Sequence, residues 1–456
     1  MKIIKLLIFV IFYLISSCSN DSYEEQDIRT IEEWGKEFKW YTKQTNSYNS
    51  DGGANVEIDS KGNIYFIGTT GGGVGIKDTF YGNKIYDSDI FIIKFNKYYE
   101  REWVKTISST YTNHGNAENA IDIEISSKDN LFILGHGTGY FDNSTSGGDK
   151  AFLLKLDQFG SKIADAQTNL PGGSDPQNIS IDSEDNIYLS NNGTLVKYDS
   201  NLNLQWTSNL SNKSRTYTHI SIDSSNNLYF SGDSSLGSDC SSNNTGQDIV
   251  FGKFDIINRS ILWEKTHSIC NDFSNSIITD NKGNFYVAGS TDRMYDNTTI
   301  GNGDEIFIGT GRNGYVMKIN SIGEIIWTRM FGNVSQVNEM KSDESGNIYI
   351  TGSTMGSFES GYNSIGLDIF LIKYDFNGNH IWSRQLGSSI SQYETSQFSD
   401  GKAGDEAKGL TIDDLNKRIY VVGSTRGDLD GNQLTFSGGS HGSQDAFITR
   451  TINIDY

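Results

Sequence analysis

Proline and recognisable catalytic motifs are both scarce in this chain. Only 2 prolines, Pro171 and Pro176, occur among 456 residues. Because proline cannot donate a hydrogen bond to a β-ladder, this scarcity suits a strand-rich chain. The H-E-x-x-H and P-loop fingerprints are absent. No catalytic, cofactor-binding or metal-binding residue is therefore predicted from a motif, and we expect no cofactor.

Basic residues are outnumbered. The chain has 37 Lys and Arg against 57 Asp and Glu, which gives a formal charge of −20 at pH 7. Such a charge repels nucleic acid and anionic lipid, so we expect no nucleic-acid partner. A soluble acidic surface is the simplest interpretation. No shift in composition marks a second domain, although the length alone would permit two or three.

A repeated unit accounts for most of the sequence. Its first half is an Asx/Gly turn followed by an apolar run, as in NIYITG from Asn347, and it occurs seven times. The third residue of every copy is aromatic: Tyr65, Phe132, Tyr188, Tyr229, Tyr286, Tyr349 and Tyr420. In the second half a basic residue precedes a tryptophan by nine or ten residues, in the pairs Lys94–Trp103, Lys197–Trp206, Lys253–Trp263, Lys318–Trp327 and Lys373–Trp382. Lys155 has Ala164 at the tryptophan position.

These units predict short antiparallel strands. Turn clusters such as Asp375–Asn379 separate β-branched and aromatic runs, four runs to a unit. Several runs are apolar throughout, which is typical of strands covered on both faces. The sequence therefore predicts an all-β fold, a seven-bladed β-propeller of four-stranded antiparallel blades. The seventh unit stops at Tyr456 before its fourth strand, so we expect Lys36–Lys43, with Trp40, to close that blade as its outer strand.

The unit resembles the SBBP repeat, a seven-bladed β-propeller repeat of bacterial extracytoplasmic proteins. The segments DIFLIKYDFNGNHIWSRQLG and NIYITGST match its D-A-F-x-x-K-L-D, G-N-x-x-W and D-x-x-G-N-x-Y-x-x-G-S-T elements most closely, and DAFITR with RIYVVGST is also near. The resemblance runs from about Trp34 to the C-terminus. It implies a propeller fold and an extracytoplasmic location, but no fixed activity and no catalytic residue.

The N-terminus has the pattern of a targeting segment. Residues 1–17 are a basic start and an apolar run typical of a signal peptide, and Leu14–Cys18 resembles a bacterial lipoprotein signal. That resemblance implies cleavage before Cys18, lipidation of Cys18 and anchoring to a bacterial membrane, with the outer membrane and the cell surface as expected locations. The alternative is an ordinary signal peptide with an incidental cysteine. We expect residues 18–30 to be an acidic tether and residues 31–456 to form the propeller.

Two other cysteines fall in connections of the fourth unit. Cys240 lies between its second and third strands, and Cys270 follows its last strand. Both connections emerge on the same rim of a propeller, and an oxidising compartment permits bonding, so a Cys240–Cys270 disulfide is our structural hypothesis. Two free thiols are the alternative, because sequence does not show the distance between them.

The long connections are the candidate functional surface. Turns between first and second strands, and between third and fourth, are short, whereas the other connections are long and variable, such as Thr69–Ser88 and Ser353–Leu367. Alternating strand directions place all the long connections on one face, which we call the long-loop face. Function on rigid scaffolds concentrates on such loops. We predict a monomeric binding or scaffolding module whose partner is a protein or a glycan. The alternative is a polysaccharide lyase or glycosidase that uses acidic residues of that face.

Three other features carry weaker hypotheses. The recurrent basic residues could form a cation ring, but we expect a structural role, such as pairing with an aspartate five residues earlier (Asp89, Asp248, Asp368, Asp445). The segment Asp428–Asn432 has part of a calcium-loop pattern, with a plain turn as the alternative. His114, His136 and His441 fall near one rim, but long loops collect polar residues, so we assign no metal site to them.

Overall fold

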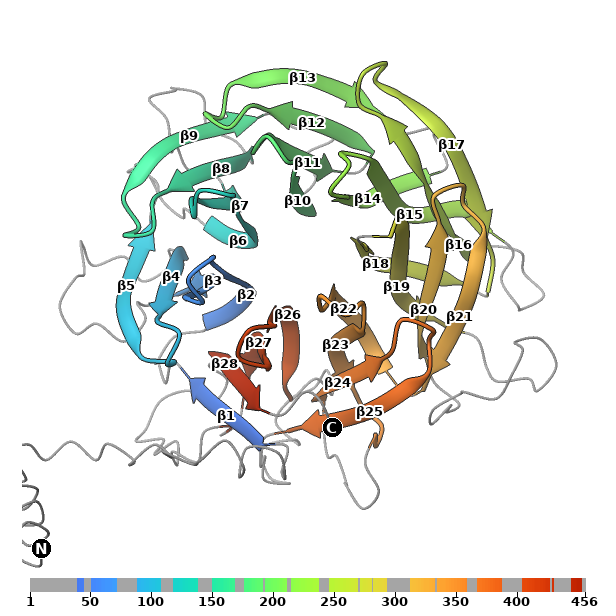
Figure 1. Ribbon diagram of the computed structural model, residues 1–456. Coiled ribbons are helices and arrows are strands. Elements are labelled where there is room, and N and C mark those ends of the chain that lie inside the picture. The colour runs from blue at the N-terminus through green and yellow to red at the C-terminus, as the bar shows by residue number, and fades with distance from the viewer. Residues whose placement is uncertain are drawn as a thin grey trace, which may run out of the picture. The chain divides into compact units, whose positions relative to one another are not determined.

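The fold is a ring of sheets (Figure 1). In the computed structural model, 28 strands form seven four-stranded antiparallel sheets, which confirms the predicted all-β propeller. The described residues belong to one unit, Phe38–Tyr456, and comprise 39–44, 51–71, 88–107, 118–137, 150–168, 176–191, 193–210, 215–237, 246–269, 271–280, 282–292, 312–332, 334–358, 367–387, 404–426, 429 and 444–452. Among them, no helix is long and apolar enough to cross a membrane.

We number the blades in chain order, and the strands of each run from the central channel to the rim. Blades 1 to 4 consist of β2 (Asp51–Ile58), β3 (Ile64–Thr70), β4 (Asp89–Phe95), β5 (Arg101–Ile107); β6 (Glu118–Ile125), β7 (Leu131–Gly137), β8 (Lys150–Leu156), β9 (Lys162–Thr168); β10 (Asn178–Ile181), β11 (Ile187–Asn191), β12 (Thr194–Tyr198), β13 (Leu204–Asn209); and β14 (Arg215–Ile222), β15 (Leu228–Gly237), β16 (Gly246–Asp255), β17 (Ser260–His267). Blades 5 to 7 consist of β18 (Asp272–Thr279), β19 (Asn284–Thr291), β20 (Asn313–Asn320), β21 (Ile325–Phe331); β22 (Val334–Ser342), β23 (Ile348–Thr354), β24 (Asp368–Tyr374), β25 (His380–Leu386); and β26 (Glu406–Asp413), β27 (Arg418–Thr425), β28 (Asp445–Ile452) with β1 (Lys39–Gln44).

The two ends of the unit meet in blade 7. Strand β1 pairs antiparallel with β28 and forms the outer strand of that blade, as the truncated seventh repeat predicts. The register differs from the simplest alignment of the repeat, because Tyr41 and not Trp40 stands opposite Arg450. The expected closing strand is confirmed, but the tryptophan position of blade 7 is occupied by a tyrosine.

The inner hairpin of a blade is built around one aspartate. In blade 6, Asp343 accepts hydrogen bonds from the Asn347 backbone amide at 2.8 Å, from the Asn347 side chain at 2.7 Å and from the Tyr349 hydroxyl at 3.0 Å. Gly346 takes a φ of 85° in the turn, a conformation open to glycine. The D-x-x-G-N-x-Y spacing therefore arises from one hydrogen-bonded turn, whose aspartate also binds the hydroxyl of the buried tyrosine.

In blades 1, 3, 4, 5 and 6 the recurring aromatic, basic and tryptophan residues form one row across the blade. In blade 6, Tyr349 lies opposite Lys373, which lies opposite Trp382. The Lys373 ammonium stands 5.3 Å from the centre of the Tyr349 ring, and that ring lies 6.1 Å from Trp382. Cation–π contacts of this kind recur in five other blades, so the basic residue has the expected structural role.

The proposed pairing of this lysine with the aspartate five residues earlier is wrong. Asp89 and Lys94 both lie in β4, and an odd separation places their side chains on opposite faces of the strand. The Lys94 ammonium instead pairs with Glu102 at 3.0 Å. In blade 5 the lysine approaches the hairpin aspartate, with 3.8 Å between Lys318 and Asp280.

The hydrophobic core is divided among the blade interfaces. Seven clusters of buried side chains exist within the described residues, and each joins two neighbouring blades. One of them packs Phe66 and Phe91 of blade 1 against Tyr420 and Val422 of blade 7. Burial at this last interface stabilises the closed ring in the same way as at the other six.

A glycine in the second strand fixes the shape of the inner strand. In six blades the inner strand has a β-bulge, and the residue before the bulge lies opposite the glycine three residues after the recurring aromatic residue, as Gly53 lies opposite Gly68. A Cβ atom on Gly68 would stand 2.2 Å from the Gly52 carbonyl oxygen. Blade 3 has Asn191 at this position, and β10 pairs with β11 without a bulge. Glycine therefore lets the bulged backbone approach the second strand.

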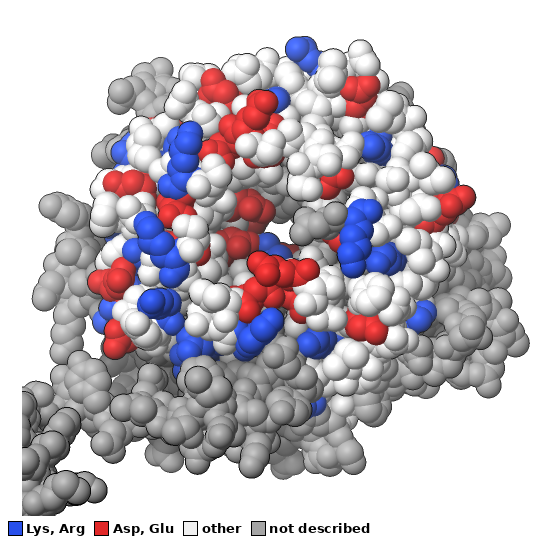
Figure 2. Space-filling model, in the orientation of Figure 1, with Lys and Arg blue, Asp and Glu red and all other residues white. Residues whose placement is uncertain are grey.

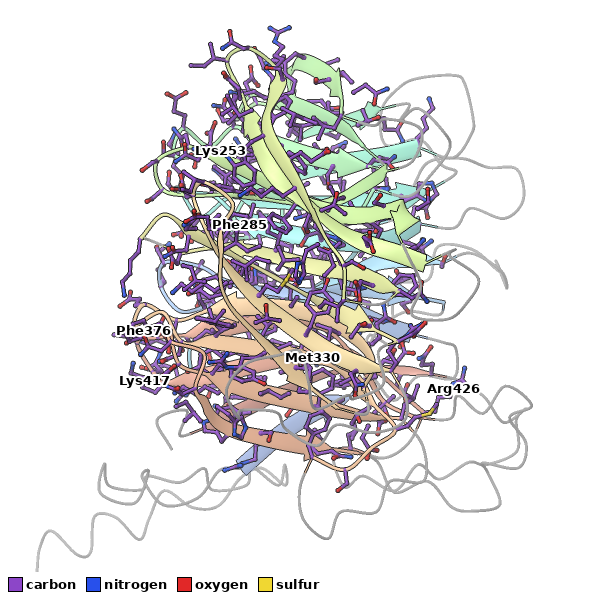
Figure 3. The ribbon with its side chains drawn as sticks, turned by 90° about the vertical axis from the view of Figure 1, so that its right-hand side faces the viewer. Lys253, Phe285, Met330, Phe376, Lys417 and Arg426 are labelled. Carbon is purple, nitrogen blue, oxygen red and sulfur yellow. The ribbon has the colours of Figure 1, made fainter. Side chains whose placement is uncertain are left out.

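The two faces of the ring differ. Antiparallel order places the hairpin turns between first and second strands, and between third and fourth, on one face, which we call the short-turn face. Lys417 and Phe376 of such turns lie on one side in Figure 3, and Arg426, which follows β27, lies on the other side. The long connections join the strand ends on the side of Arg426, and most of their residues lie outside the described part of the chain.

The close approach at Gly68 can be tested by substitution. We expect Gly68→Ala to lower the free energy of unfolding by about 1–3 kcal/mol, because the added methyl group overlaps the Gly52 carbonyl and the Phe91 ring. Gly52→Ala on the paired strand is the matched control, since a Cβ there meets nothing within 4 Å. Urea unfolding measures both. Equal effects of the two substitutions would contradict the proposed constraint.

Candidate functional site

Most residues for which the sequence suggested lipidation, a disulfide or metal binding lie outside the described residues. These are Cys18, Cys240, Cys270, His114, His441 and all of Asp428–Asn432 except Leu429. His136 lies in β7 of blade 2. Lipidation of Cys18, the Cys240–Cys270 disulfide and calcium binding at Asp428–Asn432 therefore stay predictions.

The described residues enclose a different candidate site in the central channel. The inner strands surround a cavity of about 230 Å³, and the side chains that line it are overwhelmingly polar. Figure 2, which views the short-turn face, shows Asp and Glu side chains gathered around the central opening. The sequence analysis placed function on the long-loop face and did not identify this channel.

Two rings of side chains, set by the inner hairpins, line the channel. The bulge ring lies four residues before the hairpin aspartate (Ser126 in blade 2) and consists of Asn55, Asp122, Asn178, His219, Ser276, Glu339 and Gly409. The second ring lies two residues further along each strand and consists of Glu57, Glu124, Ser180, Ser221, Ile278, Lys341 and Thr411. A sequence signal for them existed, because N-V-E-I-D and D-I-E-I-S alternate polar and apolar residues before the turn.

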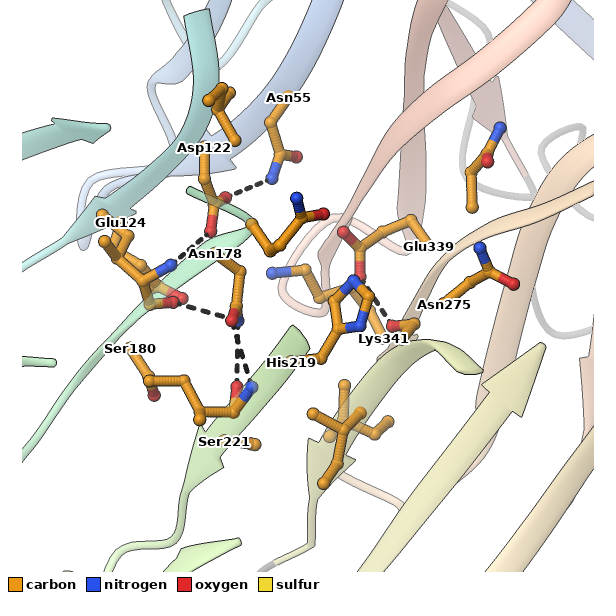
Figure 4. A pocket seen from close by; sticks show the side chains of 18 of the residues that line it. Asn55, Asp122, Glu124, Asn178, Ser180, His219, Ser221, Asn275, Glu339 and Lys341 are labelled. Atoms are coloured by element: carbon orange, nitrogen blue, oxygen red, sulfur yellow. Dashed lines mark hydrogen bonds between the residues drawn. The ribbon is translucent and has the colours of Figure 1, made fainter. Parts of the chain in front are cut away.

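Bulge-ring side chains join neighbouring blades. Asp122 accepts a hydrogen bond from the Asn55 amide at 2.6 Å and from the Ile179 backbone amide at 2.9 Å, so it contacts the blade on each side (Figure 4). Asn178 in turn accepts from the Ile220 amide at 3.0 Å and donates to the Ile220 carbonyl at 2.9 Å. These contacts hold blades 1 to 4 together at the channel wall.

Lys341 lies among the carboxylates of the second ring. Its ammonium contacts Glu57 at 2.5 Å, and Thr411 donates a further hydrogen bond to Glu57 at 3.2 Å. Glu339 of the bulge ring accepts from the Met340 amide at 2.9 Å and from Ser276 at 3.2 Å. No described residue donates a hydrogen bond to the Glu124 carboxyl, which faces the cavity.

Enclosure shifts the titration of these groups. Desolvation raises the pKa of Glu124 to about 8 and that of Glu339 to about 7, and it raises the pKa of Asp122. The Lys341 ammonium opposes all three shifts, and the surrounding carboxylates hold the pKa of Lys341 well above its ordinary value despite its burial. At neutral pH Lys341 therefore stays positively charged, and the carboxyl groups of Glu124 and Glu339 are partly protonated.

Histidine and amide side chains complete the wall. Desolvation lowers the pKa of His219 to about 4, so its imidazole is neutral at pH 7. One ring nitrogen of His219 lies 2.8 Å from the Thr218 hydroxyl. The Asn275 carbonyl oxygen lines the cavity and accepts no hydrogen bond from the described residues. The cavity therefore offers donors and acceptors to a small polar ligand.

A metal centre is not the role that this geometry favours. Within the described residues no three His, Cys, Asp or Glu side chains are placed to hold one ion. Three of the channel carboxylates, Glu57, Asp122 and Glu339, already accept hydrogen bonds from side chains. Binding of a small polar molecule suits the wall better than metal coordination does.

Comparisons with known proteins give structural similarity only. No known family matches the sequence, and no curated protein matches it. Among solved structures, the chain is similar to hydrazine synthase of Kuenenia stuttgartiensis (11% identity, 66% of this chain and 75% of that chain, TM-score 0.43). It is also similar to the WD40 domain of Neurospora crassa Pan2 (10% identity, 91% and 95%, TM-score 0.48) and to a chain of the mitotic checkpoint complex (9% identity, 87% and 88%, TM-score 0.47). The seven-bladed architecture rests on the strand pairing, and no activity follows from these similarities.

The raised pKa of Glu124 predicts a pH effect on stability. A carboxyl whose pKa is higher in the folded than in the unfolded protein binds more protons when folded, so its contribution to stability falls as pH rises from about 4.5 to about 8. We expect Glu124→Gln to remove this part of the pH dependence. Urea unfolding at pH 5, 6.5 and 8 should therefore show a stability gain relative to wild type that grows with pH.

The control for this experiment is Glu100→Gln. Glu100 is exposed in the β4–β5 turn, far from the inner strands, and undergoes the same chemical change. Its difference from wild type should stay constant with pH. The enclosed-channel interpretation is contradicted if Glu124→Gln behaves in the same way as Glu100→Gln.

Proposed function

We propose that this protein is an extracytoplasmic, lipid-anchored binding module. Its ring is a rigid scaffold, and the long-loop face holds a protein or a glycan partner. Cys18 carries the lipid anchor, residues 18–30 act as a tether, and the protein is displayed from a bacterial outer membrane. The resemblance to the SBBP repeat and the signal-like segment 1–17 support this location.

The difference between the two faces is the observation that carries the proposal. On the short-turn face, hairpins such as Asp59–Asn63 and Asp343–Asn347 share the same hydrogen bonds, and neighbouring turns contact one another: Ser60 donates to Asp129 at 3.0 Å and Ser127 donates to Asp185 at 3.1 Å. On the other face, the connections between the same strands vary widely in length. Variation confined to one face of a repetitive scaffold is typical of a recognition surface.

One observation favours a second candidate, an enzyme acting on polysaccharide. A carboxyl group with a pKa near 7 can serve as a general acid, and Glu339 and Glu124 have pKa values of about 7 and 8. These groups lie in the channel and not in the long connections, so they give no support to catalysis on the long-loop face. Turnover of a polysaccharide that is lost in Glu339→Gln would favour this candidate.

A pull-down from the envelope of the producing cell tests the binding proposal. The bait is residues 19–456, which contain the complete compact unit Phe38–Tyr456 and lack Cys18. Two variants with the connections 359–366 and 72–87 shortened serve as controls, because these segments lie outside the strands. Bound protein and bound glycan are both identified by mass spectrometry.

We expect a partner that binds the wild-type bait and is lost from at least one shortened variant. Circular dichroism and the urea midpoint show that each variant keeps the fold. A partner that binds all baits equally, or the absence of any partner, would contradict binding by the long-loop face.

A further inference from the structure

The central channel has its own binding capacity, which is independent of the long-loop face. Within the described residues, some inner strands contribute ionisable side chains to the wall: Glu57 from β2, Asp122 and Glu124 from β6, His219 from β14, Glu339 and Lys341 from β22, and Lys408 from β26. Strands β10 and β18 contribute Asn178, Ser180, Asn275 and Ser276, which are neutral. The carboxylates therefore face amide and hydroxyl groups across the cavity.

Among the described residues of this wall, acidic side chains outnumber basic ones. Within the described residues, four carboxyl groups (Glu57, Asp122, Glu124 and Glu339) surround the ammonium of Lys341. Lys341 is bound by Glu57, and Lys408 lies 2.9 Å from Glu406, outside the cluster. His219 supplies no positive charge at neutral pH. A positively charged ligand would compensate the remaining carboxylates.

Among the channel carboxyl groups, Glu124 has the most hydrogen-bond acceptor sites left unused by the described residues. Asp122 accepts three hydrogen bonds, from Asn55 and from the Ile123 and Ile179 amides, and Glu339 accepts two. Glu124 accepts none from the described residues, although it is desolvated and lines the cavity. An enclosed carboxyl without a donor gains most from a ligand that donates hydrogen bonds and carries positive charge.

The chemistry of the wall narrows the ligand class. An anion would be repelled by the carboxylates, and the described residues do not form a metal site. Among the described residues that line the cavity there is no Trp, Tyr or Phe, so they offer no aromatic surface for stacking a sugar ring. A volume of about 230 Å³ suits a molecule of a few carbon atoms. An aliphatic ammonium is the class that meets these requirements.

We propose that the central channel binds a small aliphatic amine, with its ammonium group on Glu124 and its polar end among Asn178, Ser180 and Asn275. Lys341 keeps Glu57 occupied, which leaves the Glu124 side of the channel for the ligand.

Proton release is a consequence of this arrangement. A bound ammonium favours the ionised form of Glu124 and Glu339, and so it lowers their raised pKa values. Binding at pH 7 must then release protons. The affinity should rise as pH increases from 6 to 8, because fewer protons have to be displaced.

Isothermal titration calorimetry with 1,4-diaminobutane tests the proposal. The protein is residues 19–456, and butane-1,4-diol, which has the same chain length without charge, is the control ligand. We expect binding of the diamine only, with an affinity at least about tenfold higher at pH 8 than at pH 6, and a binding enthalpy that depends on the ionisation enthalpy of the buffer.

Glu124→Gln and Glu100→Gln form the matched pair of variants. We expect Glu124→Gln to reduce the affinity for the diamine at least about tenfold and to diminish proton release, and Glu100→Gln to change neither. Unchanged urea midpoints at pH 6 show that both variants are folded. Equal binding of diamine and diol, no binding of the diamine, or equal effects of the two substitutions would overturn the proposal.

Discussion

The contact between a second-strand glycine and the bulged inner strand is the constraint on which the rest of the structure depends. A Cβ atom at Gly289 or Gly423 would overlap the carbonyl oxygen of Phe273 or Glu406, so only glycine permits the bulge. The bulge shifts the register of the inner strand by one residue, and the side chains after it enter the channel. Asp122, His219 and Glu339 all follow such a shift. The glycine of the repeat therefore determines which residues form the channel wall.

The outer part of each blade and its inner strand have different roles. The hairpin aspartate, the tyrosine, the lysine and the tryptophan occupy equivalent positions in blades 1, 3, 4, 5 and 6, and blades 2 and 7 keep the same strand pairing with Ala164 and Tyr41 at the tryptophan position. Trp327, for example, packs against Gly378 in the outer hairpin of the next blade. The inner strands share only their register. The residue types in the two rings therefore differ between blades, from glycine at 409 to lysine at 341, and the strand pairing stays the same. The seven similar blades thus surround an asymmetric channel. The inner strands of blades 1, 2 and 6 contribute acidic side chains to its wall, and those of blades 3 and 5 contribute neutral ones.

Short-range patterns predicted the fold but not the channel. The D-x-x-G-N turn, the buried aromatic residue and the Lys–Trp spacing are local signals, and they were enough for the blade count and the closing strand. The partner of Lys94 was predicted wrongly, and so was the residue opposite Arg450, which is Tyr41 and not Trp40. Pairing across strands depends on register and not on distance along the chain. The cluster of Glu57, Glu124 and Lys341 joins residues up to 284 positions apart. Each of these residues alone reads as an exposed polar position in an alternating strand, and only ring closure brings them together.

The titration of Glu124 tests the enclosed channel most directly. Carbon-13 labelling of glutamate side-chain carboxyls, with Glu124→Gln to assign the signal, gives its pKa by NMR. If the carboxyl is enclosed and only partly compensated by the Lys341 charge, its pKa should be about 8. A pKa near 4.3, the ordinary value for glutamate, would show a carboxyl in contact with bulk water or fully compensated by Lys341. That result would contradict the enclosed acidic channel on which the proposed amine site rests.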